Sequence, residues 1–145
     1  MTSGYSGTPL PKKLGIKSDH RIALIRAPRG FEATLAPLPA GVWIESNFAV
    51  GEPFDVILCF NRSCAELDAN IVPLAKRLVP NGGLWVAWPK RTSGVETDLS
   101  ENVVRAKGLE LGLVDNKICA VDETWSGLRF VIRLKDRPKS KGGRR

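Results

Sequence analysis

The sequence has few of the side chains on which most catalytic and metal sites depend. It holds one histidine, His20, and three cysteines, of which Cys59 and Cys64 are not spaced as a Cys-X-X-Cys pair. We find no Ser-His-acid set, no Gly-Lys-Ser/Thr phosphate loop and no metal-ligand pattern. The odd number of cysteines, two of them in apolar runs, also argues against a disulfide framework. The sequence therefore predicts no metal site.

Long apolar stretches are missing as well. No run approaches the length of about 20 residues that crosses a bilayer, and the first residues contain no apolar signal core. These absences favour a cytoplasmic protein without a membrane anchor. A chain of 145 residues, 43% hydrophobic and 26% charged, is large enough for a core of its own.

The positive charge is unevenly distributed. The segment 135–145 contains six basic residues and one acid, which leaves only +2 of the net +7 for the rest of the chain. We predict one α/β domain over 1–134, with an N-terminal arm and short helix at 1–19, and a disordered basic tail at 135–145. Such a tail aids solubility or gives weak, nonspecific affinity for nucleic-acid phosphates. The domain body is not expected to bind nucleic acid.

Apolar runs predict the sheet. FDVILCF (54–60) and LWVAW (84–88) have almost no polar residues, which is typical of parallel strands covered on both faces. The predicted strands are 21–26, 42–45, 54–60, 84–88, 118–121 and 128–134, and a Pro-Asn-Gly-Gly turn at 80–83 precedes the fourth. The last two are close enough to pair antiparallel. Strand–helix alternation predicts a three-layer, Rossmann-like α/β fold with a mostly parallel sheet and a C-terminal antiparallel hairpin.

Capping residues predict where helices begin. A short helix is expected between Thr8 and Gly15, and a brief helical turn at 32–35. Ser63 and Glu66 have capping-box spacing before an apolar stripe. Pro73 lies within that stripe, so we expect a kinked or split helix.

A further helix is expected after the fourth strand. Asp98 and Glu101 are its candidate capping residues, and it should run to Gly112. Leu109 and Leu111 are among the residues available for its buried side.

Polar residues collect where the predicted strands end. Ligands of open α/β sheets bind beyond the carboxyl ends of the strands, so one edge should hold a small anionic ligand or an acidic partner segment. The candidate site residues at this edge are Arg29, Arg62, Ser63, Lys90, Arg91, Asp122, Glu123 and Trp125. Cations beside the helix start at Ser63 would suit a phosphate or carboxylate.

An alternative interpretation of this edge needs no ligand. Lys90 or Arg62 could pair with Asp122 or Glu123 and close a loop, and Trp125 could either cover a ligand or pack against the rim. A catalytic acid or base would have to be Asp98, Asp122, Glu123 or Lys90, so no catalytic residue is assigned.

Several segments closely resemble a bacterial family of short, uncharacterised proteins, catalogued as a domain of unknown function. They are Tyr5 to Lys13 (YSGTPLPKK), Ala27 to Phe31 (APRGF), Leu84 to Lys90 (LWVAWPK), Ser93 to Asp98 (SGVETD) and Ala120 to Gly127 (AVDETWSG). The resemblance covers nearly the whole chain and implies no established activity.

More distantly, the order of elements is similar to class I methyltransferases that use S-adenosylmethionine. The segments concerned are Lys17 to Ile25, FDVIL at 54–58, PNGGLWV at 80–86 and the closing pair at 118–134. Ala27-Pro28-Arg29-Gly30 replaces the family's glycine-rich loop, and 45–54 is too short for its usual extra helix and strand. Our leading expectation is therefore a non-catalytic binding module without a cofactor. In the alternative, a small methyltransferase holds S-adenosylmethionine through Ala27, Gly30 and Glu45.

Overall fold

The middle layer of the computed structural model, which describes residues 7–49 and 51–138, is a six-stranded sheet in the order β2-β1-β3-β4-β6-β5. The strands are β1 (Arg21–Ile25), β2 (Trp43–Glu45), β3 (Phe54–Phe60), β4 (Leu78–Pro89), β5 (Leu113–Ala120) and β6 (Trp125–Ile132). Strands β1 to β4 are parallel, whereas β6 is antiparallel to both β4 and β5. The predicted Rossmann-like α/β fold with an antiparallel C-terminal pair is confirmed.

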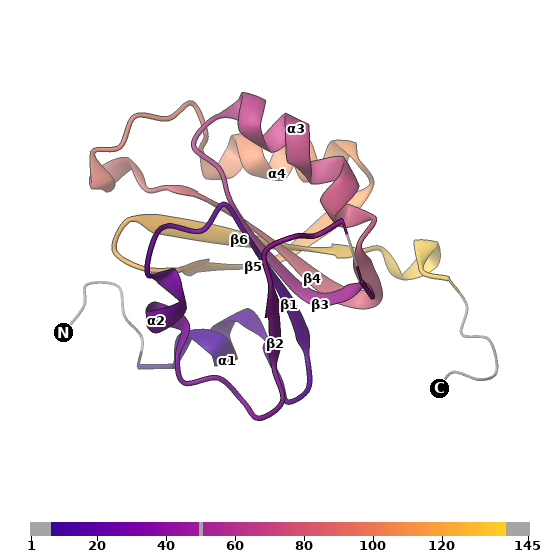
Figure 1. The fold of residues 1–145 in the computed structure, drawn as a ribbon. Helices are drawn as coiled ribbons and strands as arrows, with labels where there is room; N and C mark the ends of the chain where they lie inside the picture. Colours follow the sequence, from indigo (N-terminus) through magenta and orange to yellow (C-terminus); the bar gives the residue numbers. More distant parts are fainter. Residues whose placement is uncertain (1–6, 50, 139–145) are drawn as a thin grey trace.

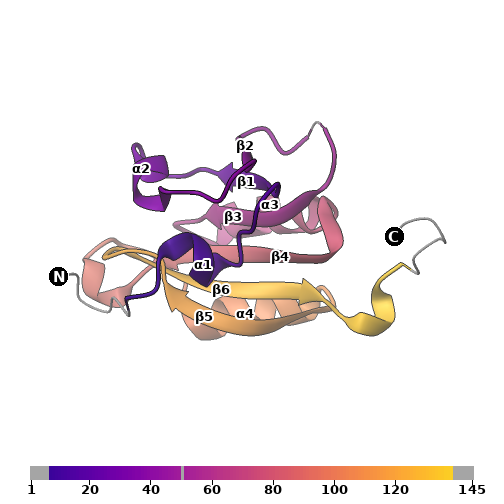
Figure 2. The same cartoon turned by 90° about the horizontal axis from the view of Figure 1, so that it is seen from below.

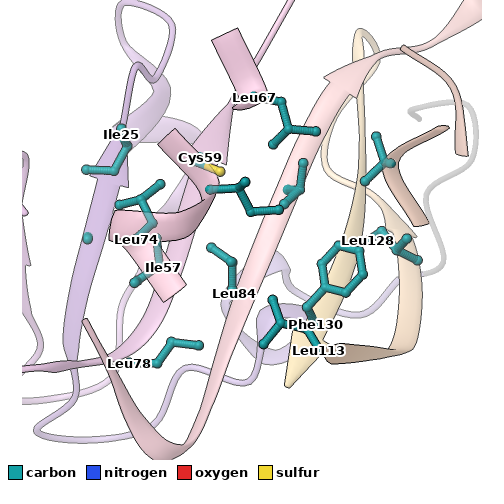
Figure 3. Close-up of a cluster of buried hydrophobic side chains, with 14 of the residues drawn as sticks. Ile25, Ile57, Cys59, Leu67, Leu74, Leu78, Leu84, Leu113, Leu128 and Phe130 are labelled. Carbon is teal, nitrogen blue, oxygen red and sulfur yellow. The ribbon is translucent and has the colours of Figure 1, made fainter. Parts of the chain in front are cut away.

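Helices cover both faces of the sheet (Figure 1). The short helices α1 (Leu10–Leu14) and α2 (Phe31–Leu35) lie on one face, and α3 (Cys64–Ala75) and α4 (Glu101–Glu110) lie on the other. Alternating side chains of the strands divide between two buried clusters, one beneath each pair of helices. Figure 3 shows part of the cluster under α3 and α4, including Ile57, Leu84 and Phe130. The three layers are therefore as predicted.

The central strands end at one edge because they are in parallel register. Ile22 pairs with Val56, and Cys59 pairs with Val86. The loops that leave β1 and β4 and the loop between β5 and β6 consequently gather on the left of Figure 1. This carboxyl edge is where the sequence places the candidate site.

The Pro-Asn-Gly-Gly segment is part of β4, so the predicted turn at 80–83 is wrong. Phe54 pairs with Leu78, and Val56 pairs with Gly83. Between these two pairs, β4 therefore contains three more residues than β3 does. The surplus forms an irregular bulge. A Cβ on Gly82 would lie 2.9 Å from the Asp55 carbonyl oxygen, so only glycine allows this close approach.

Helix α3 begins as predicted but is not split. The Ser63 Oγ accepts a hydrogen bond from the Glu66 N–H at 3.1 Å, which caps the helix. Pro73 lies inside one continuous helix that ends at Ala75. Because Pro73 is in the last turn, only the end of the hydrogen-bond ladder is affected.

Helix α4 differs from the prediction at both ends. Ser100, rather than Asp98, caps it by accepting from the Val103 N–H at 3.3 Å. The helix ends at Glu110, and Leu109 and Leu111, expected on its buried side, are 42% and 43% exposed. Both leucine side chains point outward because α4 packs on the sheet through Val104 and Gly108.

The final strands begin earlier than predicted, at Leu113 and Trp125 instead of 118 and 128. A short 3-10 helix, η2 (Leu134–Asp136), occupies the start of the predicted tail. The remainder of that tail from 139 onward, and the first six residues of the predicted arm, lie outside the described residues. Within the described part, no helix has the length and apolarity needed to cross a membrane.

Candidate functional site

Buried aromatic rings join the strand ends at the carboxyl edge. The ring centroids of Phe31 and Phe60 are 5.0 Å apart, as are those of Phe60 and Trp125, and both pairs meet edge to face. The three rings belong to the start of α2, the end of β3 and the start of β6, so they hold these segments together. Arg62 extends from the same edge, with its guanidinium carbon 5.7 Å from the centre of the Trp125 ring.

The loop between β5 and β6 is shaped by Asp122. One of its carboxylate oxygens accepts hydrogen bonds from the N–H groups of Thr124 and Trp125, both at 2.8 Å. The Thr124 carbonyl in turn accepts from the Lys90 N–H at 2.7 Å, which ties this loop to the end of β4. Trp125 is only 5% exposed, so it packs the rim and does not form a cover over a ligand. Glu123 is exposed in the same loop.

The N-terminus of α3 is occupied by the protein's own groups. The Asp98 carboxylate accepts from the Cys64 N–H at 2.8 Å, and the Glu66 carboxylate accepts from the Arg62 N–H at 2.7 Å. With Ser63 bonded to the Glu66 N–H, three N–H donors around this helix start are engaged by the protein's own side chains. Two internal carboxylates, Asp98 and Glu66, thus lie beside Ser63, where the sequence predicts an external anion.

An ion pair does cross this edge, although not between the predicted partners. Arg26 Nη2 lies 2.9 Å from Glu66 Oε2. The hydrogen bond from Arg62 N–H, together with the nearby Arg26 charge, lowers the pKa of Glu66 below its ordinary value. Among the described residues, neither Lys90 nor Arg62 forms a salt bridge to the acids of the β5–β6 loop.

A first pocket, which we call the β1 pocket, lies between the end of β1 and the start of α2. Its volume is about 480 Å³, and it is lined by Leu24, Arg26, Ala27, Pro28, Gly30, Phe31, Glu32 and Ser46. Gly30 precedes α2 with φ of +80°, and no atom lies within 4 Å of the position that a Cβ would take. Two of the three predicted cofactor residues, Ala27 and Gly30, therefore line one cavity.

The third predicted cofactor residue is directed elsewhere. The Glu45 carboxylate accepts a hydrogen bond from Trp43 Nε1 at 3.2 Å and does not line the β1 pocket. Its neighbour Ser46 does line it. Arg29, from the predicted rim, is exposed outside that lining.

A second pocket, the η1 pocket, lies at the same edge on the α4 side. It adjoins the short 3-10 helix η1 (Arg91–Ser93), has a volume of about 650 Å³, and includes Lys90, Arg91, Glu96, Thr97 and Ser126 in its lining. Two predicted rim cations, Lys90 and Arg91, thus share a cavity. The structure brings the predicted rim residues to one edge but divides them between this pocket, the α3 start, the β5–β6 loop and the β1–α2 loop that carries Arg29.

Asn61, at the end of β3, is the buried polar residue of this edge. Its Nδ2 lies 3.4 Å from the Cys59 carbonyl and 3.5 Å from the Cys59 sulfur. Its Oδ1 is buried without a hydrogen-bond partner among the described residues. Burial raises the pKa of the Cys59 thiol to about 11, so this cysteine stays protonated at neutral pH.

The sequence prediction missed several residues that line the β1 pocket, among them Phe31, Glu32 and Ser46. Phe31 and Glu32 follow the Ala-Pro-Arg-Gly loop directly, so an α2 start at this loop could have indicated them. Ser46 had no such indicator, because it becomes part of the pocket only through the parallel pairing of β1 with β2.

Comparison with known proteins places the fold among methyltransferases. No family model and no curated protein sequence matches the chain, so the resemblance to the uncharacterised family stays a prediction. A solved S-adenosylmethionine-dependent methyltransferase from Aquifex aeolicus is similar, with a TM-score of 0.59 and 14% identity over 84% of this chain and 87% of that one. An rRNA methylase from Streptococcus thermophilus gives a TM-score of 0.54 and 10% identity over 89% of this chain and 99% of that one.

A third solved structure contains the cofactor. Aeropyrum pernix fibrillarin, with natively bound S-adenosylmethionine, has a TM-score of 0.53 and 15% identity over 88% of this chain and 70% of that one. At these identities the likeness concerns the fold alone. The chain has a methyltransferase-like Rossmann fold.

Proposed function

We propose that the protein is a small S-adenosylmethionine-dependent methyltransferase that binds its cofactor in the β1 pocket. The observation that supports this most directly is the position of that pocket. It lies at the carboxyl end of β1, beside the end of β2, in a fold shared with proteins that bind S-adenosylmethionine. Open α/β sheets bind ligands beyond the carboxyl ends of their strands.

The lining suits a nucleoside because it combines apolar side chains with hydrogen-bond acceptors. Leu24, Ala27 and Phe31 offer apolar contact for a base, whereas the Ser46 hydroxyl and the Glu32 carboxylate can accept hydrogen bonds from sugar hydroxyls. Gly30 leaves open space where a side chain would otherwise project. The residues present therefore fit this cofactor without the usual glycine-rich loop.

The charge around the pocket suits a cationic cofactor as well. Arg26 is the cation in the lining, and Glu66 neutralises it at 2.9 Å. Glu32 adds a carboxylate, so the lining does not repel a sulfonium. Arg26 is hydrogen-bonded to Glu66 of α3, and Arg29 lies outside the lining.

When bound, S-adenosylmethionine supplies an electrophilic methyl group for transfer to a nucleophile. The chain's part is to bind and orient the nucleoside, through the β1 pocket, and to keep the surrounding edge rigid. Phe31 links these two roles because it lines the pocket and its ring also packs edge to face against the Phe60 ring.

Calorimetric titration with S-adenosylmethionine and S-adenosylhomocysteine tests this proposal. Ser46→Trp should abolish binding by filling the β1 pocket from an exposed position. Thr92→Trp is the matched control, since Thr92 is exposed in the lining of the η1 pocket, and this variant should bind normally. No binding by the unaltered protein, or loss in the control instead, would contradict the proposal.

A second candidate function is a non-catalytic module that binds a small anion or an acidic partner segment in the η1 pocket. It is favoured by Lys90 and Arg91, which line about 650 Å³ of space and form no salt bridge with another described residue. A paired Lys90→Gln, Arg91→Gln variant should then lose binding of a short poly-glutamate peptide in a thermal-shift titration. Equal shifts in the paired variant and the unaltered protein would rule this candidate out.

A further inference from the structure

A basic groove begins at the amino edge of the parallel strands, on the α1 face of the sheet, and shares one lining residue, Ile118, with the η1 pocket. It runs between α1 and the β5–β6 hairpin, and α1 is seen in front of these strands in Figure 2. Two adjoining cavities of about 360 and 540 Å³ form it, and they share Lys12, Lys13 and Lys117 in their lining. We call this feature the amino-edge groove.

The cations of this groove are largely uncompensated. Lys12, Lys17, Lys117 and Arg129 form no salt bridge with another described residue. Asp55 is the carboxylate in the lining, and it accepts a hydrogen bond from the Arg21 backbone N–H at 2.8 Å instead of pairing with a described lysine or arginine side chain. A concave surface with an excess of positive charge raises the local concentration of anions.

Arg129 is held in the groove at an electrostatic cost. Its guanidinium lies over Gly83, where a Cβ would overlap it, and one nitrogen bonds to the Asn116 side chain at 3.3 Å. Partial burial, and then the charge of Arg137, lower the pKa of Arg129. An anion in the groove would offset this desolvation.

We propose that the amino-edge groove binds the phosphodiester backbone of a nucleic-acid strand. Lys117 and Arg129 are paired across β5 and β6, and Lys12, Lys13 and Lys17 extend the positive surface along α1 and past its end. Cations spread over two adjoining cavities match a chain of phosphates better than a single phosphate group. Lysine side chains are flexible point charges, which contact backbones without sequence preference.

The surroundings favour backbone contact over base recognition. Trp85 lines the groove, but it is fully buried, and its Nε1 donates to the Leu14 carbonyl at 3.0 Å. It therefore cannot stack on a base. The groove thus provides charge without an aromatic platform, and binding should depend strongly on salt.

This proposal revises the expectation that only the C-terminal tail could contact nucleic acid. Lys12 and Lys117 are more than a hundred residues apart, so charge counting along the chain does not reveal the cluster. The tail and the groove can be separated experimentally because their cations belong to different segments.

Fluorescence anisotropy of a labelled short oligouridylate tests the groove in the full chain. The double variant Lys12→Gln, Lys117→Gln should bind about 20-fold more weakly near 0.1 M salt, and the slope of log affinity against log salt should fall by about 1.4. The matched control is Lys76→Gln, Lys135→Gln, which removes the same charge from exposed positions outside the groove. It should retain nearly full affinity.

Several results would overturn the groove proposal. Equal losses in the two double variants would indicate a diffuse charge effect, and loss only on deletion of 139–145 would place the contact in the tail. Displacement of the RNA by ATP at equal phosphate concentration would indicate a compact polyphosphate site instead. Undetectable binding of the oligouridylate by the unaltered protein at low salt would also contradict it.

Discussion

Replacement of Asp122 by alanine should destabilise the protein, because this side chain shapes the β5–β6 loop. The carboxylate accepts two hydrogen bonds of 2.8 Å from the backbone N–H groups of Thr124 and Trp125. Hydrogen bonds to charged groups contribute about 1.5 to 3 kcal/mol each, and because Asp122 is half-buried we take the lower end. Asp122→Ala should therefore lower the free energy of unfolding by about 3 kcal/mol.

Asparagine separates the hydrogen bonds from the charge at the same position. Asp122→Asn keeps an acceptor oxygen for both N–H groups, so it should cost only about 1 kcal/mol. Urea unfolding followed by tryptophan fluorescence measures both variants, since Trp125 is next to the altered loop. Glu123→Ala is the control, and this exposed change should stay within about 0.5 kcal/mol. If Asp122→Ala costs no more than this control, Asp122 does not shape the loop.

Two further predictions concern packing and pH. Gly108→Ala gains about 1 kcal/mol in helix propensity, but its Cβ would overlap the fully buried Phe130 ring. Because overpacking costs about 1 to 3 kcal/mol, urea unfolding should show a lower free energy of unfolding. A higher free energy of unfolding would contradict the close packing of α4 on β6. The folded pKa of Glu66 lies below its ordinary value of 4.5, so its stabilising contribution is present above about pH 4.5 and is lost as pH falls through the lowered pKa. Glu66→Gln should therefore reduce the fall in the free energy of unfolding below about pH 4.5. An unchanged pH dependence in this range would contradict the role of Glu66.

The strands could be predicted because burial on both faces leaves an unambiguous sequence pattern. β3 has the predicted bounds, Phe54–Phe60, since six of its seven residues are buried. β5 was predicted to begin five residues late because Asp115, Asn116 and Lys117 resemble a loop. They lie in a strand at the edge of the sheet, where polar side chains meet solvent.

The helix faces were harder to predict where glycine is a packing residue. Leu109 and Leu111 are the large apolar side chains near the end of α4, yet Gly108 is the residue that faces the sheet. A hydrophobicity pattern gives no weight to the space that a missing side chain leaves for Phe130. The Gly82-Gly83 pair was misinterpreted as a turn for the same reason, since its role is to admit Asp55 and Arg129 close to β4.

The location of the candidate site followed from topology, whereas its internal bonding did not. The parallel exits of β1, β3 and β4 predicted one shared edge, and the loops that carry the candidate residues gather there. Which acid contacts which donor depends on loop conformation, so the bonds from the Cys64 N–H to Asp98 and from the Arg62 N–H to Glu66 were not predicted. The basic groove depends on the pairing of Lys117 with Arg129, which no local pattern indicates.

The proposed cofactor site is tested most directly by amide chemical shifts during titration with S-adenosylhomocysteine. We predict that the largest changes occur at Ala27, Gly30, Phe31 and Ser46, which line the β1 pocket. The η1 segment Arg91–Ser93 should change little. Shifts confined to that segment, or no shifts at saturating ligand, would contradict the central claim that this methyltransferase-like fold binds its cofactor at the end of β1.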